Sequence, residues 1–250
     1  MELPILYEDA DIVAVNKPSG VLTHGTLRSL GEEGQTATAE AWFKAKYPAV
    51  ALERPYVHRL DRETSGVLVF AKNEGAWDFL RKAFTNREVK KTYLAVVYGV
   101  PSEKKGIIDF DIGRSRKDFR LRSAQPKARG TLRTAITHYE VVGETKEAGG
   151  TSRAQSREQK YALLELHPET GRTHQIRVHL KAIHHPVVGD PLYAPKGADT
   201  LGLSRMALHA YSLDLPLPAG GRTEVVATIP PDFVTILTRF SGATERFAST

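Results

Sequence analysis

Asp61 is the residue whose type and setting most clearly suggest chemistry in this sequence. It stands in the charged stretch 58–62 (HRLDR), just before the Thr-Ser-Gly turn of residues 64–66. The apolar run 67–71 that follows indicates a buried strand. A carboxylate on a loop anchored by a core strand is held where rigid scaffolds often present working groups. The residue types alone leave open a surface Arg-Asp-Arg cluster with weak ion pairs.

A single aspartate can be a nucleophile, a general base, an electrostatic stabiliser or an ion-pair partner. For covalent chemistry it must stay ionised, and a nearby guanidinium lowers its pKa and fixes its orientation. Arg177, on a predicted helix far along the chain, is a candidate partner. Tyr93, on a predicted strand, is suited either to stacking on a base or to packing in the core.

Several classes of enzyme are disfavoured by what the sequence lacks. The absence of cysteine excludes disulfides, cysteine nucleophiles and thiolate zinc sites. The histidines do not show the spacing of a zinc-binding helix: His174 and His179 are five residues apart. No Walker loop, dinucleotide fingerprint or Gly-x-Ser-x-Gly motif is present, so an ATPase, a nicotinamide dehydrogenase and a serine hydrolase are disfavoured. A glycosidase with Asp61 and either Glu63 or Asp190 as its carboxylate pair remains open.

Charge and hydropathy indicate the kind of partner. The 250 residues carry 35 lysines and arginines against 29 acidic residues, for a net charge of +6. This balance favours a polyanionic partner. The N-terminus lacks the features of a signal peptide, and no apolar run reaches 18 residues. We expect a cytoplasmic protein that does not associate with membranes and is a monomer.

Periodicity and turn residues predict an α+β fold dominated by antiparallel strands. Strands are expected at 5–7, 12–15, 67–71, 90–99, 135–142, 161–166, 206–215 and 224–229. Helices are expected at 37–47, 73–86, 173–184 and 232–240, with Asn73 as an N-cap. We expect residues 1–250 to form a single catalytic domain.

Two polar stretches interrupt this pattern. Residues 114–133 contain eight basic residues and one acid, which indicates a solvated loop or an arm that contacts phosphates. Residues 143–159 have no aromatic or aliphatic anchor beyond alanine, so we expect an exposed loop between two strands.

Five motifs, in this order, resemble the RluA-type pseudouridine synthases over residues 5–215. They are NKPSG at 16–20, HRLD at 58–61 with TSG at 64–66, KTY at 91–93, GRTHQIRVHL at 171–180, and GDPLY at 189–193. Each is weak alone, and the second and fourth together are specific.

The resemblance implies a pseudouridine synthase fold, with a mixed, mainly antiparallel sheet and a central cleft. It also implies that the protein isomerises uridine to pseudouridine in structured RNA, either rRNA or tRNA. It implies that Asp61 is the essential catalytic residue, that Tyr93 packs on the target uracil and that Arg177 pairs with Asp61. No metal and no cofactor are required. A catalytically inactive RNA-binding module is the alternative.

The resemblance also suggests which residues meet RNA. Arg59 is expected to enter the space left by the flipped nucleotide, and Lys17, His58 and Arg172 are further candidates for RNA binding. The chain departs from the family's pattern in two places. It begins with the catalytic core instead of the S4-type domain of many relatives, so RNA choice is expected to rest on the core. Residues 194–196 (APK) stand where the family often has glycine.

Overall fold

The computed structural model describes residues 1–25, 37–115, 121–124, 128–147 and 158–247. The chain divides into two compact units: unit 1 comprises residues 1–91 and 210–228, and unit 2 comprises residues 92–209 and 229–250. Short helices accompany strands that pair mostly antiparallel, which confirms the predicted α+β class. The division into two compact units does not test the expectation of a single catalytic domain, which stays a prediction.

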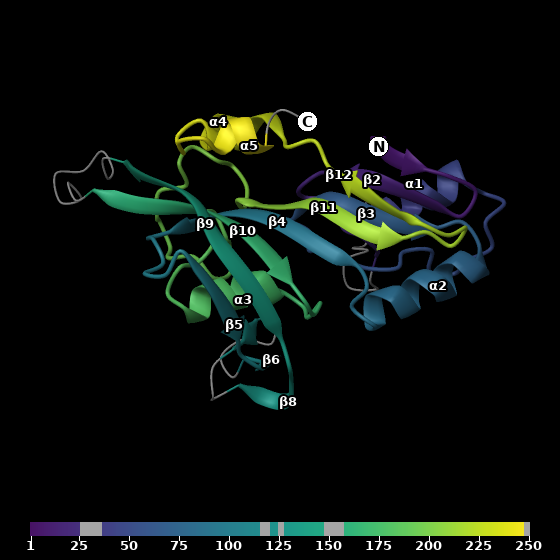
Figure 1. The fold of residues 1–250 in the computed structure, drawn as a ribbon, viewed down its shortest axis with the longest axis horizontal. Coiled ribbons are helices and arrows are strands. Elements are labelled where there is room, and N and C mark those ends of the chain that lie inside the picture. Colours follow the sequence, from purple (N-terminus) through teal and green to yellow (C-terminus); the bar gives the residue numbers. More distant parts are fainter. Residues whose placement is uncertain (26–36, 116–120, 125–127, 148–157, 248–250) are drawn as a thin grey trace, which may run out of the picture. The chain divides into compact units, whose positions relative to one another are not determined.

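Unit 1 is built on a five-stranded sheet. In spatial order its strands are β1 (Ile5–Glu8), β2 (Ile12–Lys17), β3 (Ser65–Ala71), β11 (Leu208–Pro216) and β12 (Arg222–Val226) (Figure 1). All seven residues of β3 are buried, because this strand has a hydrogen-bonded neighbour on each side and a helix on each face. It is the central element of the unit.

The helices α1 (Ala39–Lys46) and α2 (Glu74–Thr85) pack on opposite faces of β3. Successive side chains of a strand point to opposite faces. Accordingly Val69 belongs to the apolar cluster that includes α2, whereas the ring of Phe70 stacks on that of Phe43 in α1, with centroids 4.9 Å apart. The predicted N-cap is confirmed: the side chain of Asn73 accepts a hydrogen bond from the Ala76 N–H at 2.8 Å.

Gly66 is the position in β3 where only glycine fits. Its φ is +118°, and an added Cβ would lie 2.1 Å from the carbonyl oxygen of Ala210. L-residues rarely adopt such a φ, and no side-chain atom can approach a backbone oxygen so closely. The glycine of the Thr-Ser-Gly motif therefore allows β3 to pass close to β11 directly after the turn.

Unit 2 is built on an antiparallel sheet of four strands. In spatial order they are β4 (Lys90–Tyr98), β10 (Gln159–Pro168), β9 (Ile136–Glu147) and β5 (Lys105–Asp109). β9 and β10 are the longest of the four and lie side by side as a twisted ribbon (Figure 1). β9 continues to Glu147, so residues 143–147 of the predicted loop are strand. Residues 148–157 of that loop lie outside the described residues.

A small second sheet occupies part of the basic stretch 114–133. It consists of β6 (Ile112–Arg114), β7 (Arg122–Ser123) and β8 (Arg129–Arg133), in the order β7-β6-β8. The expectation of a solvated loop is wrong for these residues, because two- to five-residue strands carry too little periodicity to be recognised. The alternative, an arm that contacts phosphates, stays a prediction. Residues 116–120 and 125–127 lie outside the described part of the chain.

Three helices complete unit 2: α3 (Gln175–Ala182), α4 (Pro231–Leu237) and α5 (Ala243–Phe247). α3 begins two residues later than predicted, because His174 has a left-handed backbone with φ of 57°. The side-chain oxygen of Gln175 instead accepts hydrogen bonds from the Arg172 N–H and the Thr170 hydroxyl. No helix in the described ranges is long and apolar enough to cross a membrane.

Candidate active site

Asp61 opens a tight turn that leads directly into β3. The Thr64 N–H donates to the Asp61 carbonyl oxygen at 3.2 Å, and the strand begins at Ser65. The Asp61 side chain is half-buried, whereas every residue from Thr64 to Ala71 is buried. The predicted arrangement, in which a carboxylate on a short turn is anchored by a core strand, is thus present in unit 1. We call residues 61–64 the Asp61 turn.

A second loop, residues 17–24, holds the Asp61 turn in place. The Gly20 N–H donates to the Arg62 carbonyl oxygen at 2.8 Å, and the Arg62 Nε donates back to the Gly20 carbonyl oxygen at 3.1 Å. The Ser19 hydroxyl donates to the Glu63 carbonyl oxygen at 2.7 Å. These bonds join segments more than 40 residues apart in the chain, and they fix the backbone that carries the carboxylate.

Lys17 is fully buried beneath these two segments. Its Nζ donates to the carbonyl oxygens of Pro18, Val21 and Arg62, at 3.0, 2.8 and 3.3 Å. Three acceptors match the three N–H bonds of an ammonium group. Burial lowers the pKa of Lys17 to about 7, and the nearby charges of Asp61 and Glu63 oppose that shift. Because this side chain has no exposed surface, the geometry supports positioning of the Asp61 turn instead of the expected RNA contact.

His58 is also turned inward. Its Nε2 accepts a hydrogen bond from the Val69 N–H of β3 at 3.1 Å, and its ring stacks on Phe84 with centroids 4.9 Å apart. Burial, with a smaller contribution from the positive charge of Lys91, lowers the pKa of His58 to about 3. As a neutral imidazole that accepts the Val69 N–H, His58 attaches the Asp61 segment to β3. The expected contact of His58 with RNA stays a prediction.

Arg59, by contrast, is exposed. Within the described residues its guanidinium has no hydrogen bond or ion pair, and its charge contributes to lowering the pKa of the neighbouring His24. The expected contact of Arg59 with RNA stays a prediction.

Arg177 lies in the interior of unit 2 and meets Asp190. Nε and Nη2 of its guanidinium donate to the two oxygens of the Asp190 carboxylate, at 2.7 and 2.8 Å. The two side chains are 1% and 0% exposed. Asp61 belongs to unit 1, and its pairing with Arg177 stays a prediction. The Asp190 carboxylate also accepts the backbone N–H groups of Leu192 and Tyr193, so it is not placed to serve a glycosidase pair.

Tyr193 is a member of this cluster that sequence reasoning did not single out. The Arg177 guanidinium lies 5.2 Å from the centre of its ring, and Lys181 lies 5.6 Å away. Its hydroxyl accepts from the Arg122 N–H and is 2.9 Å from His174 Nδ1. The GDPLY motif could have indicated Tyr193, because an aspartate three residues before it can accept its backbone N–H and so fix the turn to which the tyrosine ring is attached.

The two other predicted site residues also lie in unit 2. Tyr93 is a half-buried residue of β4, opposite Leu166 of β10. Arg172 is half-buried in the turn before α3, and its Nε donates to the Thr134 carbonyl oxygen at 3.1 Å. The sequence-predicted residues therefore form two groups: Lys17, His58, Arg59 and Asp61 in unit 1, and Tyr93, Arg172 and Arg177 in unit 2.

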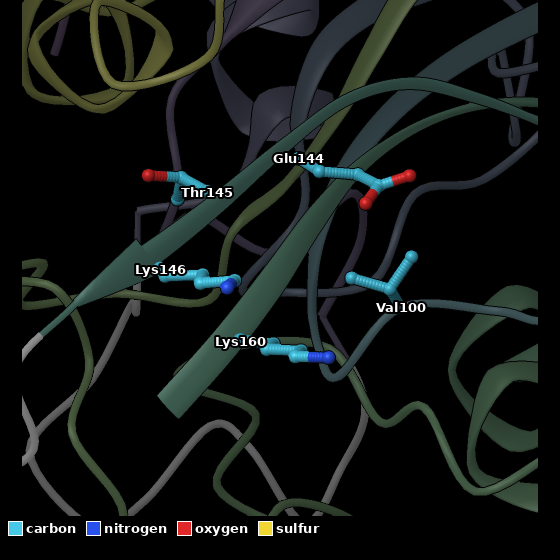
Figure 2. Close-up of a pocket in the computed structure, with 5 residues that line it drawn as sticks. All are labelled: Val100, Glu144, Thr145, Lys146 and Lys160. Atoms are coloured by element: carbon cyan, nitrogen blue, oxygen red, sulfur yellow. The ribbon is translucent and has the colours of Figure 1, made fainter. Parts of the chain in front are cut away.

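An open pocket of about 450 Å³ lies elsewhere in unit 2, on the ribbon of β9 and β10. It is lined by Val100, Glu144, Thr145, Lys146 and Lys160 (Figure 2). Two of its three charged residues are paired locally: Lys146 with Glu158, and Glu144 with Lys104. None of the predicted site residues lines this pocket. In the described part of the chain, no cluster of three histidine or acidic residues is arranged to hold a metal ion.

Comparison with known proteins identifies the family. Residues 11–182 match the model of the RNA pseudouridylate synthase family. An uncharacterized RNA pseudouridine synthase of Mycobacterium bovis is 41% identical over 92% of this chain and 70% of its own length. The tRNA pseudouridine synthase C of Haemophilus ducreyi is 34% identical over 87% of both chains, and the ribosomal large subunit pseudouridine synthase D of Borreliella burgdorferi is 31% identical over 97% of this chain and 70% of its own.

A solved structure agrees with the sequence comparison. The human RNA pseudouridylate synthase domain containing 1 superposes with a TM-score of 0.74 and 27% identity, covering 100% of this chain and 96% of the other. The chain therefore belongs to the RNA pseudouridylate synthase family, whose members are isomerases that convert uridine to pseudouridine in RNA. The RluA-type resemblance drawn from the five motifs is confirmed.

Proposed function

We propose that this protein isomerises specific uridines of structured RNA, in tRNA or rRNA, with Asp61 as its essential catalytic residue. The observation that carries the proposal is the way unit 1 holds Asp61. Asp61 is only half-buried, while the backbone on both sides of it is tied to the 17–24 loop and to β3. A catalytic group must be held in this manner to keep its geometry while its functional atoms stay accessible.

The reaction determines what each residue has to do. The N1–C1′ bond of the target uridine breaks, the uracil rotates, and C5 bonds to C1′; C5 loses its proton and N1 gains one. The uridine must first leave its stack, at an unstacking cost of a few kcal/mol. We assign Tyr93 to packing against the extruded uracil and Arg59 to the space that the nucleotide leaves, which offsets part of that cost.

We assign Arg177 to the ionised carboxylate of Asp61. The buried ion pair with Asp190 supports this role, because it holds two of the guanidinium nitrogens in a fixed plane. Lys17 acts as a positioning residue, because its ammonium binds the carbonyl oxygens of Pro18, Val21 and Arg62 around the Asp61 turn.

Exposed arginines bind RNA phosphates and so contribute affinity that does not depend on the RNA sequence. Arg114, in β6, and Arg133, in β8 of the same small sheet, are both exposed. The names of two relatives contain tRNA and the large ribosomal subunit respectively, which supports these two substrate classes for this chain.

A tritium-release assay tests the proposal. Transcripts of tRNAs and rRNA fragments labelled with [5-³H]uridine are incubated with wild type, with Asp61→Asn and with Asp78→Asn, whose side chain is exposed on α2, as a control. We expect release from at least one RNA by wild type and by Asp78→Asn, and none by Asp61→Asn. Release by Asp61→Asn at the wild-type rate overturns the role of Asp61. RNA binding without release by wild type favours the inactive RNA-binding module.

A further inference from the structure

His24 and Tyr56 form a ring pair beside the Asp61 turn. Their ring centroids are 4.9 Å apart with an interplanar angle of 29°, and both side chains are half-exposed. Neither ring nitrogen of His24 nor the Tyr56 hydroxyl has a hydrogen-bond partner within the described ranges. Core aromatic residues usually have such polar atoms satisfied. Among the described residues, this pair thus presents both flat apolar surface and polar atoms without a partner at the surface of unit 1.

The pair is fixed to the Asp61 segment by a reciprocal hydrogen bond. The Thr23 hydroxyl donates to the Leu60 carbonyl oxygen at 2.9 Å, and the Leu60 N–H donates to the same hydroxyl oxygen at 3.2 Å. His24 directly follows Thr23 in the chain, and Asp61 directly follows Leu60. Since one residue advances the chain by less than 4 Å, the Cα atoms of His24 and Asp61 lie within about 15 Å of each other.

Two arginines, Arg59 and Arg54, act electrostatically on His24, and Arg54 is paired with Glu53 at 3.6 Å. Burial lowers the pKa of His24, and the guanidinium charges of Arg59 and Arg54 lower it further, against the opposing effect of Glu40. The Glu40 carboxylate is paired with Lys44 at 2.9 Å. A neutral imidazole stacked on a phenol offers a flat surface on which a base can stack, and the exposed guanidinium of Arg59 is nearby.

We propose that His24 and Tyr56 form a stacking site for one unstacked RNA nucleotide that neighbours the target uridine. This inference rests on the proposed function, because it requires that the target reaches Asp61. The site gives the enzyme a contact outside the reacting nucleotide, and it therefore favours RNAs in which a nucleotide beside the target uridine is unstacked. The bound base lies on the exposed surface of the ring pair, where stacking tolerates any base.

The first test separates RNA binding from chemistry. With a [5-³H]uridine transcript that wild type modifies, we expect His24→Ala and Tyr56→Ala each to raise KM about tenfold, as the loss of one base–aromatic stack predicts. We expect kcat to change less than about twofold. His24→Phe, which keeps a ring, should restore KM. Phe79→Ala removes an exposed aromatic ring from α2 of the same unit and should leave KM unchanged. If the alanine variants fold poorly by circular dichroism, His24→Leu fills the volume without a stacking ring.

The second test detects the stack directly. Single abasic nucleotides are placed on either side of the target uridine. We expect one position to raise the wild-type KM about tenfold, and the same abasic RNA to cause no further loss in His24→Leu, because the two changes remove one interaction. An equal abasic effect in wild type and variant at every position, or an unchanged KM in the variants, overturns the stacking site. A wild type that releases no tritium from any transcript instead overturns the proposed function, whatever the variants do.

Discussion

Arg177 and Asp190 form a two-point ion pair that is almost completely removed from solvent, with N–O distances of 2.7 and 2.8 Å. The pair joins α3 to the turn of the GDPLY motif, and the same carboxylate accepts two backbone N–H groups of that turn. Its attraction is largely offset by desolvation while both partners are present, but the loss of one partner leaves a buried charge uncompensated.

Replacing Asp190 by asparagine should therefore destabilise the protein by about 3–5 kcal/mol, because the buried Arg177 charge loses its two-point carboxylate partner Asp190. The partly exposed pair of Arg205 and Asp232 has a similar two-point geometry in the same unit, and it supplies a matched control. We expect Asp232→Asn to cost about 1 kcal/mol or less. Urea unfolding followed by circular dichroism measures both; equal losses in the two variants would contradict this account.

Lys17→Met should change how stability depends on pH. The folded protein releases the Lys17 proton near pH 7, whereas the unfolded chain keeps it up to its ordinary pKa of about 10.5. The unfolded state thus binds more protons within this window, so wild type gains stability as the pH rises from 7. We expect the stability of wild type relative to Lys17→Met to increase by at least about 1 kcal/mol between pH 7 and 9.

The control for this experiment is Lys90→Met, whose side chain is 81% exposed. The stability difference between wild type and this variant should stay constant over the same pH range. If the difference for Lys17→Met were equally constant, the Lys17 ammonium would not be perturbed by its burial.

His58→Gln should flatten the acid side of the stability profile. Glutamine offers a carbonyl oxygen to the Val69 N–H but does not titrate. In wild type the folded protein resists protonation of His58 down to about pH 3, while the unfolded chain binds the proton near pH 6.5. Wild type must therefore lose stability as the pH falls below 6.5. We expect it to lose about 1–2 kcal/mol relative to His58→Gln between pH 7 and 5. Parallel profiles would show that the imidazole is not held neutral.

Gly66→Ala should be among the most damaging single substitutions in unit 1. The new Cβ would meet the Ala210 carbonyl oxygen in a backbone that has no room to shift, and φ at this position is +118°. We expect a loss of more than about 3 kcal/mol or failure to accumulate folded protein. Gly20→Ala is the control: its φ is +87°, but nothing lies within 4 Å of the added atom. That variant should lose only about 1–2 kcal/mol, the cost of the left-handed backbone. Similar denaturation midpoints for the two would contradict the packing argument.

Local patterns in the sequence predicted most of the fold. The helix 73–86, its N-cap Asn73 and the buried strand after the Thr-Ser-Gly turn were all expected, because capping and hydrophobic periodicity act over a few residues. The small sheet of β6, β7 and β8 was missed, because its short strands are stabilised by pairing between segments that carry no periodic signal of their own.

For the candidate site, the sequence by itself determined which residues belong to the family's motifs, and the order of those motifs was enough to indicate the family. Only the tertiary structure decided what several of these residues contact. It buried Lys17 against a carbonyl oxygen 45 residues away and joined Arg177 to Asp190. It also placed His24 against Tyr56. Side-chain type and local spacing encode chemical capacity, but burial, charge state and partners arise from contacts between distant segments, and these form only when the chain folds.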